Sequence, residues 1–155
     1  MEKLEKFLLN WGEFGELSKA FSKQLKERYS GKIDVVIGIA KGGLPLSLQI
    51  ANELGATWDS MRVASYIADY TRGKMNLLHD IHVDINNKTV MIVDDIADEG
   101  KTMEFVKNHL YTNYQPHEII TTVLFLKPTS KFKPDNYLEK TEKWVMFPWE
   151  AETEI

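Results

Sequence analysis

The feature that most constrains the fold is an almost continuously apolar, β-branched run at residues 33–39. A strand of this composition has to be covered on both faces, which is the usual environment of a parallel sheet. Helical periodicity flanks the run. Apolar residues recur at steps of three and four from Phe14 to Tyr29, and residues 44–54 form a second helical stretch that ends at Gly55. The sequence therefore predicts a buried strand between two helices.

The rest of the chain continues this alternation. Strands are predicted at residues 62–67, 89–93 and 119–126, with a helix from about 101 to 110 and a last strand around 144–147. Strands that alternate with helices indicate an α/β fold with a doubly wound, mostly parallel sheet flanked on both faces. In such sheets, ligands bind beyond the carboxyl ends of the strands.

Length and composition narrow the class of protein. The 155 residues fit one domain, 1–155, and 23 acidic against 19 basic side chains give a net charge of −4, which argues against a general nucleic-acid binder. The absence of cysteine excludes disulfides, thiolate metal sites and a cysteine nucleophile. We find neither a secretory signal nor an apolar run near the ~20 residues of a membrane span, so we expect a cytoplasmic protein.

Two adjacent carboxylates, Asp94 and Asp95, follow the predicted strand at 89–93. Like charges at the end of a buried strand are costly unless a cation or hydrogen-bond donors meet them, and Mg²⁺ and the vicinal hydroxyls of a ribose both fit. Residues 98–102 then form a tight turn onto a helix start, whose N–H groups and Thr102 hydroxyl can hold an anion. Together they indicate a ribose 5-phosphate site, although the acidic pair alone fits a solvated, capped turn equally well.

A second loop follows the strand at 33–39, where Ala40 and Lys41 precede Gly42 and Gly43. Glycines let backbone N–H groups approach an anion, and the lysine adds a positive charge. By itself the loop is equally well explained as a plain strand-to-helix turn, but beside the acidic motif it indicates a second phosphate or pyrophosphate site. Neither loop is a Walker A or dinucleotide-binding glycine motif, because residues 95 and 40 are not glycine.

These motifs resemble those of the type I phosphoribosyltransferases. Residues 92–102 resemble the family's signature for phosphoribosyl pyrophosphate (PRPP), and residues 40–43 resemble its pyrophosphate loop. Lys127 and residues 144–150 resemble the base-binding region of the short xanthine–guanine and hypoxanthine–guanine enzymes. The resemblance covers most of the chain in matching order. It implies a small C-terminal hood for the base, at about 127–150.

The resemblance also implies a role for each site residue. Asp98 would be the catalytic acid or base at N7 of a purine, and Asp94, Asp95 and Glu150 would bind Mg²⁺. The implied contacts are Asp94, Asp95, Asp98, Glu99, Gly100, Lys101 and Thr102 for the ribose and 5-phosphate, Ala40, Lys41, Gly42 and Gly43 for pyrophosphate, and Lys127, Trp144 and Val145 for the base. In this family the peptide that enters the loop lysine is often cis.

The residue chemistry fits the base assignment. A purine stacks on an aromatic ring such as Trp144, a contact worth about 1–3 kcal/mol per base. The ammonium of Lys127 can donate to a 6-oxo group and would not suit the amino group of adenine. The resemblance further implies that Ser65 and Tyr66, together with a mobile loop predicted at about 68–80, would close over the site and exclude water.

One position departs from the family. Glu99 stands where the family usually has threonine, beside the 5-phosphate. A carboxylate that faced a phosphate would repel it. We therefore expect the Glu99 side chain to point to solvent while its backbone N–H takes part in the anion cradle.

The sequence thus predicts a purine phosphoribosyltransferase of nucleotide salvage. Such an enzyme transfers the 5-phosphoribosyl group from PRPP to N9 of guanine, xanthine or hypoxanthine and releases pyrophosphate. The alternatives are a PRPP- or nucleotide-sensing regulatory protein on the same fold, or a phosphoribosyltransferase for another base. The expected partners are PRPP, a purine base or nucleotide and further copies of the chain in a dimer or tetramer, with no nucleic acid and no membrane.

Overall fold

The computed structural model of the chain describes residues 5–65 and 74–150. Its main strands are β2 (Val35–Ala40), β3 (Thr57–Ser65), β4 (Met75–His79), β5 (Thr89–Ala97), β6 (Glu118–Leu126) and β7 (Asn136–Lys140). They form one sheet in the order β4-β3-β2-β5-β6-β7, in which every neighbouring pair is parallel except β3 and β4. This is the mostly parallel α/β sheet that the alternation of strands and helices predicts.

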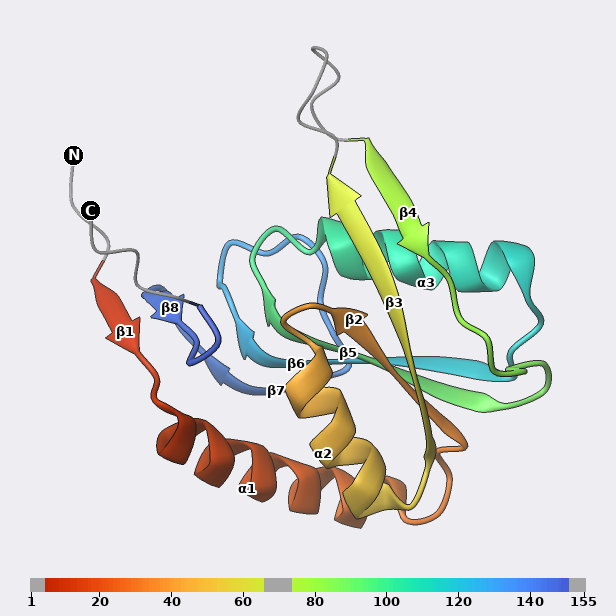
Figure 1. The fold of residues 1–155 in the computed structure, drawn as a ribbon, viewed down its shortest axis with the longest axis horizontal. Coiled ribbons are helices and arrows are strands. Elements are labelled where there is room, and N and C mark those ends of the chain that lie inside the picture. The colour runs from red at the N-terminus through yellow and green to blue at the C-terminus, as the bar shows by residue number, and fades with distance from the viewer. Residues whose placement is uncertain (1–4, 66–73, 151–155) are drawn as a thin grey trace.

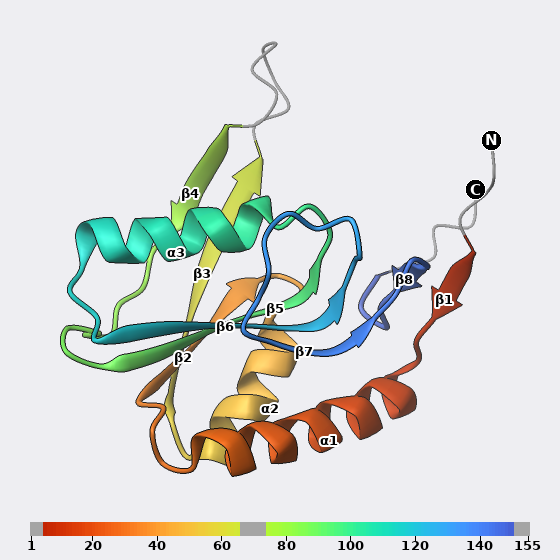
Figure 2. The same ribbon diagram turned by 180° about the vertical axis from the view of Figure 1, so that it is seen from behind.

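In the described part of the chain, three helices cover the sheet: α1 (Trp11–Tyr29), α2 (Leu44–Leu54) and α3 (Lys101–Asn113). Figures 1 and 2 show α1 and α2 on one face of the sheet and α3 on the other. The predicted doubly wound arrangement is therefore confirmed. Within the described residues, no helix is long and apolar enough to cross a membrane.

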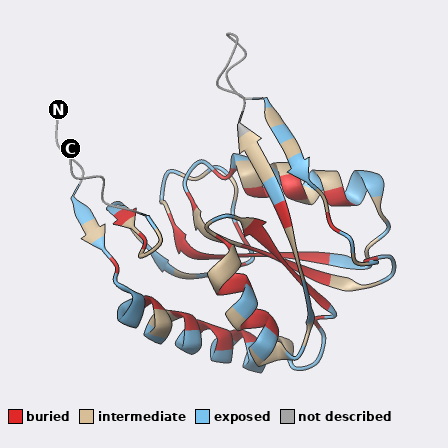
Figure 3. Cartoon of the chain, in the orientation of Figure 1, coloured by how far each residue is buried: buried red, intermediate tan, exposed pale blue. Residues whose placement is uncertain are grey.

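The central strands explain why the apolar runs are continuous. In β5, Met91 and Val93 belong to the cluster under α1 and α2, whereas Val90 and Ile92 belong to the cluster under α3. Successive side chains of a strand point to opposite faces, and here both faces are buried (Figure 3). Each fully buried aliphatic side chain contributes roughly 1.5–3 kcal/mol to folding.

A second sheet joins the two ends of the chain. It pairs β1 (Lys6–Leu8) with β8 (Trp144–Met146) in parallel, with Lys6 opposite Trp144. The sequence predicts β8 but gives no sign of β1. Of the two strands in the predicted hood, β7 joins the main sheet beside β6. Strand β8 pairs with β1 instead and lies outside the main sheet.

Several element boundaries differ from the sequence prediction, and two of them follow directly from contacts in the structure. Helix α1 begins at Trp11 because Asn10 caps it: the Asn10 side chain accepts a hydrogen bond from the Glu13 N–H (2.8 Å). Strand β3 begins at Thr57, well before the predicted 62–67, since it pairs along the whole of β2.

The predicted loop at 68–80 is wrong for its second half, where β4 pairs with β3. Met75 and Leu77 are half-buried, but Leu78 is an exposed leucine that obscures the alternation typical of an edge strand. The first half of that loop, 68–73, lies outside the described residues.

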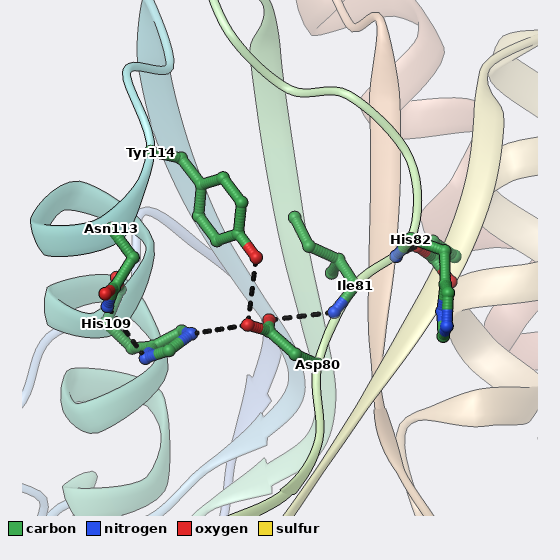
Figure 4. A network of polar contacts seen from close by, with 7 residues as sticks. Asp80, Ile81, His82, His109, Asn113 and Tyr114 are labelled. Atoms are coloured by element: carbon green, nitrogen blue, oxygen red, sulfur yellow. Dashed lines mark hydrogen bonds and ion pairs between the residues drawn. The ribbon is translucent and has the colours of Figure 1, made fainter.

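Asp80, directly after β4, fastens this strand to the C-terminal end of α3 (Figure 4). Its carboxylate accepts a hydrogen bond from the Tyr114 hydroxyl (2.9 Å), contacts His109 Nε2 (3.1 Å) and accepts another from the Ile81 N–H (2.8 Å). Burial alone would raise the pKa of Asp80, but these partners outweigh it and hold the pKa below its ordinary value. Asp80 therefore attaches the end of β4 to α3, the helix that follows the loop predicted to bind phosphate.

Close packing of α2 on β2 gives a test of the fold. A Cβ on Gly38 would lie 2.1 Å from the Ser47 hydroxyl oxygen, whereas a Cβ on Gly15 in α1 meets nothing within 4 Å. We expect Gly38→Ala to lower the free energy of unfolding by about 1–3 kcal/mol through overpacking. The matched control, Gly15→Ala, should raise it by roughly 0.5–1 kcal/mol, because alanine is the better helix former. Urea denaturation measures both changes, and a Gly38→Ala protein as stable as the parent would contradict the packing.

Candidate active site

The two predicted loops meet at the carboxyl ends of β2 and β5, which are neighbours in the sheet. The contact between the loops is close. A Cβ on Gly42 would lie 2.1 Å from Asp95 Oδ2, and one on Gly43 would lie 2.5 Å from the carbonyl oxygen of Val93. Only a residue without a side chain lets the first loop lie this near the acidic pair. The structure thus brings together residues 40–43 and the pair at 94–95.

The first loop places Lys41 at the surface, beside this contact. The Ala40–Lys41 peptide is cis. The Gly43 N–H donates to the Ile39 carbonyl (2.8 Å), and the Leu44 N–H donates to the Lys41 carbonyl (3.0 Å), which turns the chain directly into α2. The Lys41 side chain is exposed, so its charge is accessible to an anion at the strand ends.

Asp94 and Asp95 form an electrostatically costly pair. Both side chains are half-buried, and the Asp95 N–H donates to Asp94 Oδ1 (2.8 Å), while the Ile96 N–H donates to Asp95 Oδ1 (2.7 Å). Burial and the charge of Asp95 raise the pKa of Asp94 well above its ordinary value, and burial also raises the pKa of Asp95. A cation or a set of hydroxyl donors that meets this pair would relieve the cost.

The donor set at this point fits Mg²⁺. This ion prefers oxygen ligands and is commonly held by one or two carboxylates, with the remaining positions taken by substrate phosphates and water. Burial, followed by the charge of Asp95, raises the pKa of Glu150, so this third carboxylate lies within the field of the pair. Over residues 5–65 and 74–150, however, no three side chains of histidine, cysteine, aspartate or glutamate form a complete metal site.

The second loop, which is predicted to hold an anion, leads into α3. Gly100 precedes the helix with a φ of 83°, a left-handed conformation that favours glycine. A Cβ there would lie 2.2 Å from the Cβ of Phe132, so the segment after β6 packs directly against this turn. The first backbone N–H groups of α3 have no partner within the helix and are available to an anion.

The Glu99 side chain points to solvent, as the sequence predicts. Its carboxylate pairs with the ammonium of Lys101 (2.7 Å), and both side chains are about two-thirds exposed. Hydrogen bonding and attraction from Lys101 lower the pKa of Glu99. The negative charge is therefore turned outward onto a neighbouring cation.

A cleft of about 670 Å³ lies over these strand ends. It is lined by Asp94, by residues 96–103 and by Val63, Ala64 and Met75. Asp98 is exposed on its wall. The volume is in the range of small-molecule sites. The sequence analysis missed Val63, Ala64 and Met75, because these residues come next to the strand ends only once β3 and β4 take their places in the sheet.

Of the predicted base-binding residues, Lys127 lies beside the cleft. The Lys127 N–H donates to the Ala97 carbonyl (3.0 Å), which places Lys127 next to Asp98. Trp144 is 55% exposed, so its ring can receive a ligand. Trp149 packs instead in the aromatic core, parallel to Phe147 with ring centroids 4.9 Å apart.

The backbone of Val145 is oriented by the small sheet. The Trp144 N–H donates to the Glu5 carbonyl, and the Met146 carbonyl accepts from the Leu9 N–H. Because backbone groups of successive strand residues point to opposite sides, those of Val145 face away from β1. Its side chain is buried. Of the remaining predicted residues, Ser65 ends β3 and Tyr66 lies outside the described residues.

The chain matches one family of known proteins. Residues 6–154 match the family described as "Phosphoribosyl transferase domain". The chain is 30% identical over 138 residues to the hypoxanthine-guanine phosphoribosyltransferase of Lactococcus lactis subsp. lactis. The aligned region covers 85% of this chain and 74% of that protein. It is 27% identical over 152 residues to the xanthine-guanine phosphoribosyltransferase of Desulfotalea psychrophila. That alignment covers 95% of this chain and 88% of the other protein.

A solved structure agrees in fold as well as in sequence. The purine phosphoribosyltransferase from Pyrococcus horikoshii OT3 superimposes with a TM-score of 0.86 at 34% identity, over 97% of both chains.

Because burial raises the pKa values of Asp94 and Asp95, we expect neutralisation of one of them to stabilise the fold. Because the folded-state pKa values of both carboxyl groups are raised, their ionisation opposes folding, and this cost grows as the pH rises from about 4. Asp95→Asn removes one charge and keeps the Oδ1 acceptor for Ile96. We expect it to stabilise the protein at pH 7.5 by about 1–2 kcal/mol, or several degrees in melting temperature, with the gain vanishing near pH 4.

Thermal unfolding in the presence of EDTA measures this effect. Glu139→Gln, which neutralises an exposed carboxylate on β7, is the matched control and should change the melting temperature little. An Asp95→Asn protein that melts below the parent at pH 7.5 would contradict the electrostatic cost.

Proposed function

Since the chain belongs to the phosphoribosyltransferase family, we propose that it is a purine phosphoribosyltransferase of nucleotide salvage. It would transfer the 5-phosphoribosyl group from PRPP to N9 of a 6-oxopurine and release pyrophosphate. The observation that supports the proposal is the close approach of Gly42 to Asp95, because it brings the loop predicted to bind pyrophosphate next to the carboxylates predicted to bind the ribose. The similarity to hypoxanthine-guanine and xanthine-guanine enzymes supports a 6-oxopurine as the acceptor.

PRPP would occupy the cleft with its sugar on the acidic pair. The ribose hydroxyls are donors that match the carboxylates of Asp94 and Asp95. The 5-phosphate would accept hydrogen bonds from the N–H groups of residues 99–102 and from the Thr102 hydroxyl, with the helix dipole of α3 favouring the negative charge. Lys41 and the adjacent glycines would meet the pyrophosphate.

Mg²⁺ would be held by Asp94 and Asp95, with Glu150 at the edge of its ligand shell and PRPP oxygens completing it. When bound, this ion would neutralise charge on the departing pyrophosphate. The carboxylates themselves hold the sugar in place while the bond to the base forms.

The base would lie between the cleft and β8. The Trp144 ring is exposed for stacking, and the outward backbone groups of Val145 can bond the edge of a purine. Lys127 would donate to the 6-oxo group. Asp98, beside the Ala97 carbonyl that holds Lys127, would accept or return the N7 proton during transfer.

A panel of bases tests the proposal. The purified protein with PRPP and Mg²⁺ is supplied with guanine, xanthine, hypoxanthine, adenine, uracil or orotate, and nucleotide formation is followed. We expect product with at least one 6-oxopurine and none with adenine, and EDTA should abolish it. PRPP binding without product from any base would favour the regulatory alternative, and product from adenine alone would contradict the base assignment.

Because the Glu99 side chain points outward and pairs with Lys101, we expect its replacement to change the KM for PRPP only slightly. Because its charge is already met by Lys101, Glu99→Thr should change the KM for PRPP less than about threefold, as for other exposed pairs. Lys101→Met, which leaves the carboxylate without a partner, should raise that KM by a larger factor. A large fall in KM on Glu99→Thr would instead show that the carboxylate repels the 5-phosphate.

The cytoplasmic location and the dimer or tetramer expected from the family resemblance stay predictions. Closure of the site by Tyr66 also stays a prediction.

A further inference from the structure

The side chain of Lys127 is held by two main-chain carbonyls. Its ammonium donates to the carbonyl oxygens of Glu142 (3.2 Å) and Lys143. A lysine ammonium has three N–H donors and no acceptor. With two donors engaged, one is left for a ligand, and its direction follows from where the two carbonyls lie.

Those carbonyls belong to a short turn that Thr141 organises. The Thr141 N–H donates to the Leu126 carbonyl (3.0 Å), which ties the turn to the residue before Lys127. The Thr141 hydroxyl then accepts a hydrogen bond from the Lys143 N–H (3.1 Å). A hydroxyl that bonds the backbone two residues further on closes a local turn without help from regular secondary structure.

The same turn leads directly into β8. The Trp144 N–H donates to the Glu5 carbonyl (2.9 Å) as the strand begins. Lys143 also forms an ion pair with Glu5 (3.3 Å), but these side chains are 47% and 74% exposed, and such surface pairs contribute little. The Thr141 hydroxyl therefore holds a turn that fixes both the Lys127 ammonium and the entry to the strand bearing Trp144.

We infer that Thr141 is a positioning residue for base recognition, whose hydroxyl fixes the turn at 141–143 so that its carbonyls aim the third donor of Lys127 at the 6-position of the base. This rests on the proposed function, in which Lys127 meets the 6-oxo group. A 6-oxo oxygen accepts from an aimed donor, whereas a 6-amino group presents another donor. A loosely held ammonium could rotate away from the 6-amino group of adenine. By holding the ammonium in place, the turn at 141–143 contributes to discrimination between 6-oxo and 6-amino purines as well as to affinity.

Steady-state kinetics with Thr141→Val and Thr141→Ser test the inference. Valine keeps the shape of threonine but cannot accept the hydrogen bond. Thr141→Val should raise the KM for the 6-oxopurine about three- to tenfold, the range expected for one hydrogen bond, with kcat and the KM for PRPP within twofold of the parent. Thr141→Ser should restore the parental KM, and Thr112→Val, at an exposed position on α3, should leave it unchanged.

A double-mutant comparison separates positioning from a purely structural role. In a Lys127→Met background, Thr141→Val should have no further effect on the KM for the base, because the group that it positions is gone. An equal increase in both backgrounds, or a parallel rise in the KM for PRPP, would overturn the inference. Thr141→Ala repeats the comparison if circular dichroism shows that the valine variant is unfolded.

The two proposals fail in different ways. A parent protein that forms product with none of the bases would overturn the proposed function and the inference with it. An active parent whose KM for the base is unaltered by Thr141→Val would overturn the inference alone.

Discussion

Two carboxylates held side by side at the end of a buried strand are the constraint around which the site is built. Asp94 and Asp95 lie in the last part of β5, which runs on to Ala97 instead of ending at residue 93 as predicted, and burial raises the pKa of each. The folded chain by itself offers them few compensating donors, mainly the backbone N–H groups of Asp95 and Ile96. Ionisation of this pair opposes folding, and a bound sugar or cation would offset that cost.

The sheet topology places the other parts of the site around that pair. Parallel neighbours end at the same edge, so the loop after β2 lies against Asp95 through Gly42. The turn after β5 becomes the start of α3, and the chain after β6 returns through Lys127 to the Ala97 carbonyl. Three consecutive strand ends thus supply groups suited to pyrophosphate, ribose phosphate and base, in that spatial order.

Much of this arrangement follows from the sequence, because it depends on local patterns. Continuous apolar runs indicate strands with both faces buried, and an acidic pair before a glycine turn indicates an anion site wherever the strand is placed. The missed features depend on distant partners. Strand β1 is three residues long and pairs with β8 at the other end of the chain. The acceptors of Lys127 are main-chain carbonyls, which any residue type carries, so no sequence pattern announces them.

We propose that a nucleotide lies across the ends of β5 and β6 with its ribose on the acidic pair. The most direct measurement is a crystal structure of the protein with guanosine 5′-monophosphate. We expect the phosphate on the N–H groups of residues 99–102, both ribose hydroxyls on Asp94 and Asp95, and the 6-oxo group within hydrogen-bond distance of Lys127. A phosphate bound at residues 40–43 instead, or ribose hydroxyls turned away from the carboxylates, would contradict it.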